Sequence, residues 1–286
     1  MSFGGPQNMF ANQLSNAFGS TTNAISSATN ISGSIIAVIM IVMLSMVVIG
    51  YIVYRFLVSS LKATQLTTGI THCRTGSKTI TGKKLPELVN GKEWSVSFWL
   101  YVESAAHTNS EKHIVTFGPD RDLAPFSVMM DRNVNRLYLV FRTNTAGTGN
   151  DAISQLIKFK SGVPPESHVI VPIEYVPLSR WVMVSVVVDQ DTVTTYFDGT
   201  IYSVVSSARF KQNAIISDPA KDDVIVGSSS NGADAYLSKL KFYNYGVSVY
   251  QVQTEYRGGP GASGILGALG VSKYRLQWPV TTATTS

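Results

Sequence analysis

The sequence has few charged residues and almost no cysteine. Charged side chains make up 14% of the 286 residues, against about 25% in an average soluble domain, which excludes a disordered chain kept open by charge. The single cysteine, Cys73, excludes an internal disulfide framework and any structural zinc site with two or more thiolates. The four histidines never form the H-E-x-x-H zinc motif. The composition therefore indicates a chain that can form an apolar core and that has no recognisable zinc motif.

Positive charge is confined to one short stretch. Residues 1–54 contain no charged residue, and residues 55–84 contain six basic residues and no acidic one, which leaves 17 of the 23 basic residues and all 18 acidic ones for the rest. A nucleic-acid binder usually spreads positive charge over one face of its fold, so we expect no nucleic-acid partner. A basic run beside an apolar segment is more typical of contact with anionic lipid headgroups.

An uninterrupted apolar stretch runs from Ile35 to Tyr54. Its twenty residues (IIAVIMIVMLSMVVIGYIVY) carry no charge, and at ~1.5 Å per residue such a helix spans the ~30 Å hydrocarbon core of a bilayer. Tyr51, Tyr54 and Arg55 stand at its C-terminal end, as aromatic and basic membrane anchors do. A buried core helix is rarely apolar on every face, and a cleaved signal peptide begins with positive residues. The sequence therefore predicts one transmembrane helix in contact with the lipid bilayer.

The flanking charges predict the orientation of this helix. Positive residues stay on the cytoplasmic side of a membrane span, and here they follow the span, at Arg55, Lys62 and Arg74. We therefore expect a single-pass protein with an exoplasmic N-terminus and a C-terminal domain on the cytoplasmic side. The one glycosylation sequon, at residues 30–32, precedes the span, and the lone Cys73 suits a reducing compartment.

The predicted helix divides the chain into five segments. Residues 1–34 are too rich in Ser, Asn, Gly and Thr to form a core, so we expect them to be disordered. Residues 35–54 are the helix, residues 55–89 a basic juxtamembrane neck, and residues 90–258 the folded domain. Residues 259–286 form a Gly-rich and then apolar tail, which either folds against its own domain or docks on a neighbour.

The sequence of the folded domain predicts a series of short strands. Its β-branched and aromatic runs recur every 8–15 residues between turn-forming residues, which predicts an all-β, antiparallel two-sheet sandwich. Asp198-Gly199 is a hairpin signal, in which Gly199 supplies a positive φ. The only helix that we expect runs from Ser248 to Tyr256, with Ser248 as its cap. The expected strands are residues 94–103, 113–117, 126–131, 136–142, 168–173, 181–189, 192–197, 201–205, 223–226 and 236–243.

Four of these segments resemble the LamG-like, concanavalin A-type jelly rolls. The hairpin WVMVSVVVD-x-DTVTTYFDGT contains Trp181, Asp198 and Gly199, and is similar to the core hairpin of that family. The stretch VIVGSSSNGADAYLSKLKFYN, with Gly227, is similar to its Gly-rich loop and last strand. EWSVSFWLY, with Trp94, resembles an early strand, and SVYQVQTEY resembles the short closing helix. The resemblance covers residues 90–258 and implies a jelly-roll sandwich.

The same superfamily includes glucanases, but the chain lacks their carboxylate pattern. Glycoside hydrolysis needs two carboxyl groups about 5–9.5 Å apart, which this superfamily places on one strand as E-x-D-x-E, and no such triplet occurs here. The G-x-G-x-x-G match at residues 259–264 follows a helix rather than a strand, so we interpret it as a linker. We expect no enzyme activity, no catalytic residue and no cofactor-binding residue.

Calcium or sugar binding on loops at one edge of the sandwich stays open. Related domains use Asp and Asn side chains there, and calcium takes six to eight oxygen ligands. Solvated turn residues are the alternative interpretation, because spacing does not show which loops converge. The candidate ligands are Asp120, Asp122, Asp131, Asn231 and Asp234.

Two functions compete at this stage, and a cellular membrane-anchored protein of unrelated role stays open beside them. The resemblance extends to membrane-anchored virion proteins of large double-stranded DNA viruses, which implies a structural virion protein, a minor capsid protein that links an internal membrane to capsid proteins. The alternative is a membrane-anchored, lectin-like adhesin that binds glycans, which requires the domain to lie outside, against the orientation predicted by the flanking charges.

Overall fold

The computed structural model describes residues 33–89, 93–118, 120, 122–147, 151–219 and 221–261 of the chain. It divides into two compact units, Met1–Ser60 and Leu61–Ser286. The described part of the first unit is one helix, α2 (Gly33–Ser60), which contains the predicted membrane segment. Tyr51 and Tyr54 are exposed on it, and the side chain of Arg55 lies outside the described residues. Among described residues, no helix meets the length and hydropathy needed to cross a membrane.

The second unit contains two antiparallel sheets. Sheet A has the strand order β1-β13-β4-β9-β10-β11, with β2 also paired to β13, and sheet B has the order β3-β12-β5-β6-β7-β8. Sheet A consists of β1 (Ala63–Gln65), β2 (Thr71–His72), β4 (Glu93–Val102), β9 (Trp181–Asp189), β10 (Thr192–Phe197), β11 (Thr200–Ser206) and β13 (Ala235–Tyr243). Sheet B consists of β3 (Lys78–Ile80), β5 (Lys112–Phe117), β6 (Phe126–Met130), β7 (Leu137–Arg142), β8 (His168–Ile173) and β12 (Val224–Val226).

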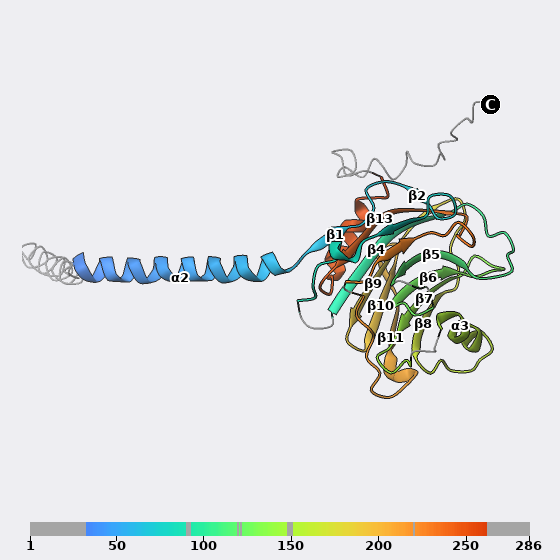
Figure 1. The fold of residues 1–286 in the computed structure, drawn as a ribbon. Helices are drawn as coiled ribbons and strands as arrows, with labels where there is room; N and C mark the ends of the chain where they lie inside the picture. Colours follow the sequence, from blue (N-terminus) through green and yellow to red (C-terminus); the bar gives the residue numbers. More distant parts are fainter. Residues whose placement is uncertain are drawn as a thin grey trace, which may run out of the picture. The chain divides into compact units, whose positions relative to one another are not determined.

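The two sheets enclose one apolar core and form a β-sandwich (Figure 1). Alternate residues of each strand enter this core: on β9 these include Val182, Val184 and Val186, all fully buried. Trp94 lies at the centre, with its ring 5.6 Å from that of Phe126 on the opposite sheet. Burial on this scale supplies most of the stabilisation, at roughly 25 cal/mol per Å² of apolar surface. The sandwich predicted from the strand pattern is confirmed.

A helix covers part of the outer face of each sheet. The predicted helix is confirmed as α4 (Val249–Arg257), which begins with a capping box between Ser248 and Gln251 and stacks Tyr256 on Trp99 of sheet A at 5.8 Å. A second helix, α3 (Ala152–Lys160), was not expected from the sequence. It packs Leu156 on the outer face of β7 and β8. Its short length gives little periodic signal, and it depends on its Asp151 N-cap and on tertiary contact.

The sandwich begins earlier than the domain boundary drawn from the sequence. Within the segment predicted as a basic neck, β1 pairs with β13, β2 with β13, and β3 with β12. Three strands of two or three residues are too short to show a period-two pattern. Described residues of this segment from Leu61 onward therefore belong to the folded domain. At the other end, residues 259–261 are described and residues 262–286 lie outside the described part.

The residues predicted as fold signatures have local structural roles. Trp94 is in the core, whereas Trp181 is half-buried on the outer face of sheet A. Asp198 and Gly199 have φ values of 49° and 79°, which are the two left-handed residues of a tight hairpin between β10 and β11. The Asp198 carboxylate also accepts a hydrogen bond from the backbone N–H of Met183 at 2.9 Å and pairs with Arg180.

Candidate ligand-binding site

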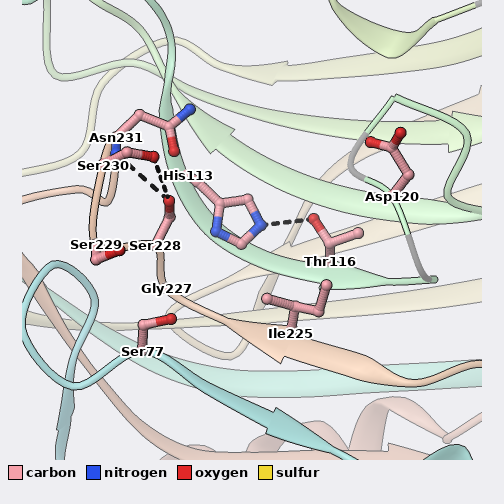
Figure 2. Close-up of a pocket in the computed structure, with 10 residues that line it drawn as sticks. All are labelled: Ser77, His113, Thr116, Asp120, Ile225, Gly227, Ser228, Ser229, Ser230 and Asn231. Atoms are coloured by element: carbon pink, nitrogen blue, oxygen red, sulfur yellow. Dashed lines mark hydrogen bonds between the residues drawn. The ribbon is translucent and has the colours of Figure 1, made fainter.

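A polar pocket lies on the outer face of sheet B, over β12 and β5. Figure 2 shows the residues that line it. Its volume is about 360 Å³. One wall is the loop that follows β12, residues 227–231, which we call the serine loop (Gly227, Ser228, Ser229, Ser230 and Asn231). We call the cavity the serine-loop pocket. The other lining residues are Ser77, His113, Thr116, Asp120 and Ile225.

Backbone hydrogen bonds fix the serine loop. Its first two N–H groups donate to Ile114 and Cys73, each at 2.8 Å, and the N–H of His113 donates to the carbonyl of Asn231 at 2.8 Å. Within the loop, Ser228 and Ser230 share a hydrogen bond between their hydroxyls at 3.1 Å. The loop therefore presents its side chains from a fixed backbone rather than from a free tip.

Two glycines allow the loop to lie against the turn between β2 and β3. Gly227 has a φ of 69°, and a Cβ there would lie 2.1 Å from the Cys73 carbonyl oxygen. A Cβ at Gly232 would lie 2.3 Å from the same oxygen. Both contacts are far too short for any side chain, and the φ of Gly227 is one that glycine adopts without strain. Gly227, predicted from the resemblance as a fold signature, thus builds the wall of the pocket.

His113 and Thr116 form the floor of the pocket. Their side chains leave the outer face of β5, and His113 Nε2 lies 2.6 Å from Thr116 Oγ1. His113 is only 4% exposed, so its position is set by packing rather than by solvent. Residue spacing alone does not reveal this pair, because a β-bulge after His113 places both residues on one face.

The lining of the pocket is rich in groups that form hydrogen bonds. Hydroxyls of serine and threonine both donate and accept hydrogen bonds, and an amide and a carboxylate add fixed acceptors. Ile225 supplies the one apolar side chain. A pocket of this kind suits a small, uncharged ligand with several hydroxyl groups, and its volume falls in the ~300–1,000 Å³ range of small-molecule sites.

The five residues predicted as calcium or sugar ligands lie in separate places. Asp120 and Asn231 line the serine-loop pocket, and the backbone N–H of Asp122 donates to the Asp120 carboxylate at 3.1 Å. Asp131 instead accepts from Tyr138 Oη at 3.0 Å and pairs with Lys160 at 3.0 Å. Lys160, Asn133 and Tyr138 hold the pKa of Asp131 below its usual value despite burial. The structure therefore brings two of the five to the pocket, and calcium binding stays a prediction.

Asp234 belongs to a different cluster, with His72 and Glu103, whose ligand-type atoms lie within 4.8 Å of one another. His72 Nδ1 accepts a backbone hydrogen bond from Thr75 at 3.1 Å, so the ring proton is on Nε2, which faces the Asp234 carboxylate at 3.3 Å. An Nε2 that carries a proton has no lone pair for a metal. The cluster fits a hydrogen-bonded pair better than a metal centre.

An aromatic row crosses sheet A beside this cluster. His72, Tyr236, Tyr101 and Trp181 are register partners on four adjacent strands, with ring centroids 4.8–6.1 Å apart. The rings are tilted by 52–75° to their neighbours, so they pack edge to face. Because they are not coplanar, the row is a packed surface layer rather than a flat stacking platform.

Comparison with known proteins gives matches among solved structures alone. No family model and no curated protein matches the sequence. Among solved structures, the chain is similar to the receptor binding domain of botulinum neurotoxin D, with a TM-score of 0.47 and 11% identity over 69% of this chain and 48% of that chain. It is also similar to the botulinum neurotoxin serotype D ligand binding domain in complex with N-acetylneuraminic acid, with a TM-score of 0.46 and 11% identity over 69% and 46%.

The matched region therefore spans about half the length of those toxin domains. The domain of this chain is an antiparallel β-sandwich. At TM-scores below 0.5, the likeness does not transfer the ligand of either toxin domain to this chain.

Proposed function

We propose that this chain is a non-enzymatic interaction protein whose β-sandwich binds a glycan in the serine-loop pocket, and which a helix at residues 35–54 anchors in a membrane. The observation that carries the proposal is the lining of the pocket, in which hydroxyl and amide groups of a fixed loop stand beside the Thr116 hydroxyl of β5 and the Asp120 carboxylate of the segment that follows β5. Sugars present several hydroxyls around an apolar ring face, and Ile225 offers a matching apolar contact. The finer jelly-roll family, LamG-like, stays a prediction.

The membrane anchor is supported by the sequence between Ile35 and Tyr54. Twenty residues without charge are long enough for a bilayer core, and the described side chains of α2 from Val38 to Tyr54 are exposed. Exposed apolar side chains on all sides of a helix suit lipid rather than water. Tyr51 and Tyr54 lie on this helix at the end that precedes Arg55, where interfacial anchors are expected.

The side of the membrane on which the domain lies decides between the two functions. The prediction of a cytoplasmic-side domain counted Arg74 among the flanking charges. Arg74 lies between β2 and β3 in the folded sandwich, and folded domains cross membranes largely regardless of their charge. Only Arg55 and Lys62 then remain close to the span. The smaller charge bias weakens the objection to the glycan-binding function, which needs an exoplasmic domain.

A binding experiment tests the glycan site directly. The full chain in lipid nanodiscs is applied to a panel of neutral and acidic oligosaccharides, beside the variants Ser229→Trp and Ser161→Trp. Ser229 is exposed on the serine loop, so tryptophan there fills the pocket, whereas Ser161 is exposed at the end of α3. We expect binding by the native chain and by the Ser161 variant, and loss in the Ser229 variant. Binding that survives Ser229→Trp places the ligand elsewhere and refutes the site.

Protease protection of the membrane-inserted chain tests the second candidate. The basic flank at Arg55 favours a cytoplasmic-side domain, where a structural virion protein could link an internal membrane to capsid proteins. Cleavage of residues 61–261 only from the cytoplasmic side supports that bridging role and contradicts the adhesin. Cleavage only from the exoplasmic side supports glycan binding.

Repeating the glycan assay with a calcium chelator separates a calcium-dependent site from one built by side chains alone.

A further inference from the structure

Lys112 is a buried lysine at one end of the sandwich. It is the first residue of β5 and pairs with the core residue Met130, so its side chain starts on the inner face of sheet B. It is 2% exposed, and no acceptor among the described residues forms a hydrogen bond with its Nζ. A buried ammonium group without a partner costs free energy, and this position therefore calls for an explanation.

The nearest carboxylates are engaged by other residues. Asp131 pairs with Lys160 at 3.0 Å, and Asp234 lies 3.3 Å from His72 Nε2. Burial lowers the pKa of Lys112, and Arg74 lowers it further, while Asp131 and Asp234 partly oppose that change from a distance. Lys112 thus has favourable charges nearby but no direct counter-ion within the described chain.

Lys112 lines a second cavity, next to the serine-loop pocket. This cavity has a volume of about 280 Å³ and is lined by Arg74, Lys112, the residues Thr108–Ser110 and the loop residues Ser230–Gly232. Ser230 and Asn231 line both cavities, so the two cavities adjoin. Two positive side chains surrounded by hydroxyl and amide groups make a suitable setting for an oxyanion.

We infer that the Lys112–Arg74 cavity is a subsite for an oxyanion, the carboxylate or sulfate group of an acidic saccharide whose neutral part occupies the serine-loop pocket. The inference rests on the proposed glycan-binding function and narrows its substrate class. Lys112 supplies the buried positive charge that discriminates acidic from neutral sugars, and Arg74, exposed at the rim, adds a second donor. The ligand in turn supplies the counter-ion that Lys112 lacks.

Thermal unfolding of the full chain in nanodiscs, titrated with small probes, tests this subsite. Glucuronate is compared with glucose, and sulfate with chloride at equal ionic strength, for the native chain and for Lys112→Met, Arg74→Gln and Lys158→Met. Methionine keeps the length of Lys112 without its charge, and Lys158 is a matched surface lysine that lies 3.3 Å from Glu166. We expect glucuronate, sulfate or both to raise the Tm of the native chain and of the Lys158 variant. We expect apparent affinity to fall on the order of tenfold in Lys112→Met and less in Arg74→Gln.

The outcomes separate the subsite from the function. Stabilisation by glucuronate alone assigns a carboxylated sugar, and stabilisation by sulfate alone assigns a sulfated one. An equal Tm response in Lys112→Met, or no advantage of either anion over its control, overturns the subsite. If Lys112→Met does not fold, an unchanged response in Arg74→Gln overturns it. Glycan binding that is blocked by Ser229→Trp but shows no preference for acidic sugars leaves the proposed function in place and refutes only this inference.

Discussion

Replacing Gly227 by alanine adds a single Cβ atom, which tests how closely the serine loop approaches Cys73. The new Cβ would lie 2.1 Å from the Cys73 carbonyl oxygen, and the φ of 69° is unfavourable for any side chain. The left-handed conformation costs about 1–2 kcal/mol, and overpacking against backbone costs about 1–3 kcal/mol more. We therefore expect Gly227→Ala to lower the free energy of unfolding by about 2–5 kcal/mol, or Tm by roughly 5–20 °C in a domain of this size.

Two other glycines separate the contributions. Gly162 has a φ of 83° with nothing within 4 Å of its Cβ position, so alanine there costs only the backbone conformation. Gly69 has neither a positive φ nor a neighbour within 4 Å, so Gly69→Ala leaves stability unchanged or raises it slightly. Urea unfolding followed by tryptophan fluorescence ranks the three variants. If Gly227→Ala costs no more than Gly162→Ala, the close approach of the serine loop to Cys73 is refuted.

Three further predictions concern buried groups and one cap. Burial, with the positive charge of Arg142, lowers the pKa of His168 to about 4 from 6.5. Since the unfolded chain takes up a proton at this residue below pH ~6.5 and the folded chain does not, the free energy of unfolding falls by up to ~3 kcal/mol as the pH drops toward 4. A His168→Gln variant that keeps this pH dependence contradicts the assignment. Burial raises the pKa of the Cys73 thiol to about 12, so thiol reagents label it only on unfolding, and rapid labelling of the native chain refutes its burial. Ser248→Ala removes the hydrogen bond to the Gln251 N–H and lowers stability by ~1 kcal/mol; a thermal melt that is unchanged contradicts a role for the cap.

The proposed ligand and the predicted orientation make opposite demands on the same domain. A glycan-binding domain has to face the exterior, whereas Arg55 and Lys62 favour the cytoplasmic side. The structure reduces this conflict because it assigns Arg74, one of the three flanking charges, to the folded sandwich rather than to a juxtamembrane neck. Arg74 then gains a local explanation, since it lines the cavity that contains Lys112.

Much of the fold could be predicted from local sequence pattern. Long strands such as Trp181–Asp189 alternate between a buried and an outer face, and that alternation is visible in the sequence. The Asp198-Gly199 turn and the Ser248 cap are equally local, because each depends on residues within a few positions. The strands at residues 63–65, 71–72 and 78–80 were missed, since two or three residues carry no period.

The sequence by itself determined an all-β domain, its hairpins, its closing helix, and an uncharged segment long enough to span a bilayer. The tertiary structure decided which polar residues meet. Asp120 and Asn231 line one pocket because β5 and β12 are neighbouring strands. Asp131 instead forms an ion pair with Lys160 of α3. A β-bulge places His113 beside Thr116 in the serine-loop pocket, and Lys112 lines the second cavity. Contacts between residues more than a hundred positions apart leave no trace in local spacing, so the site had to be read from the fold.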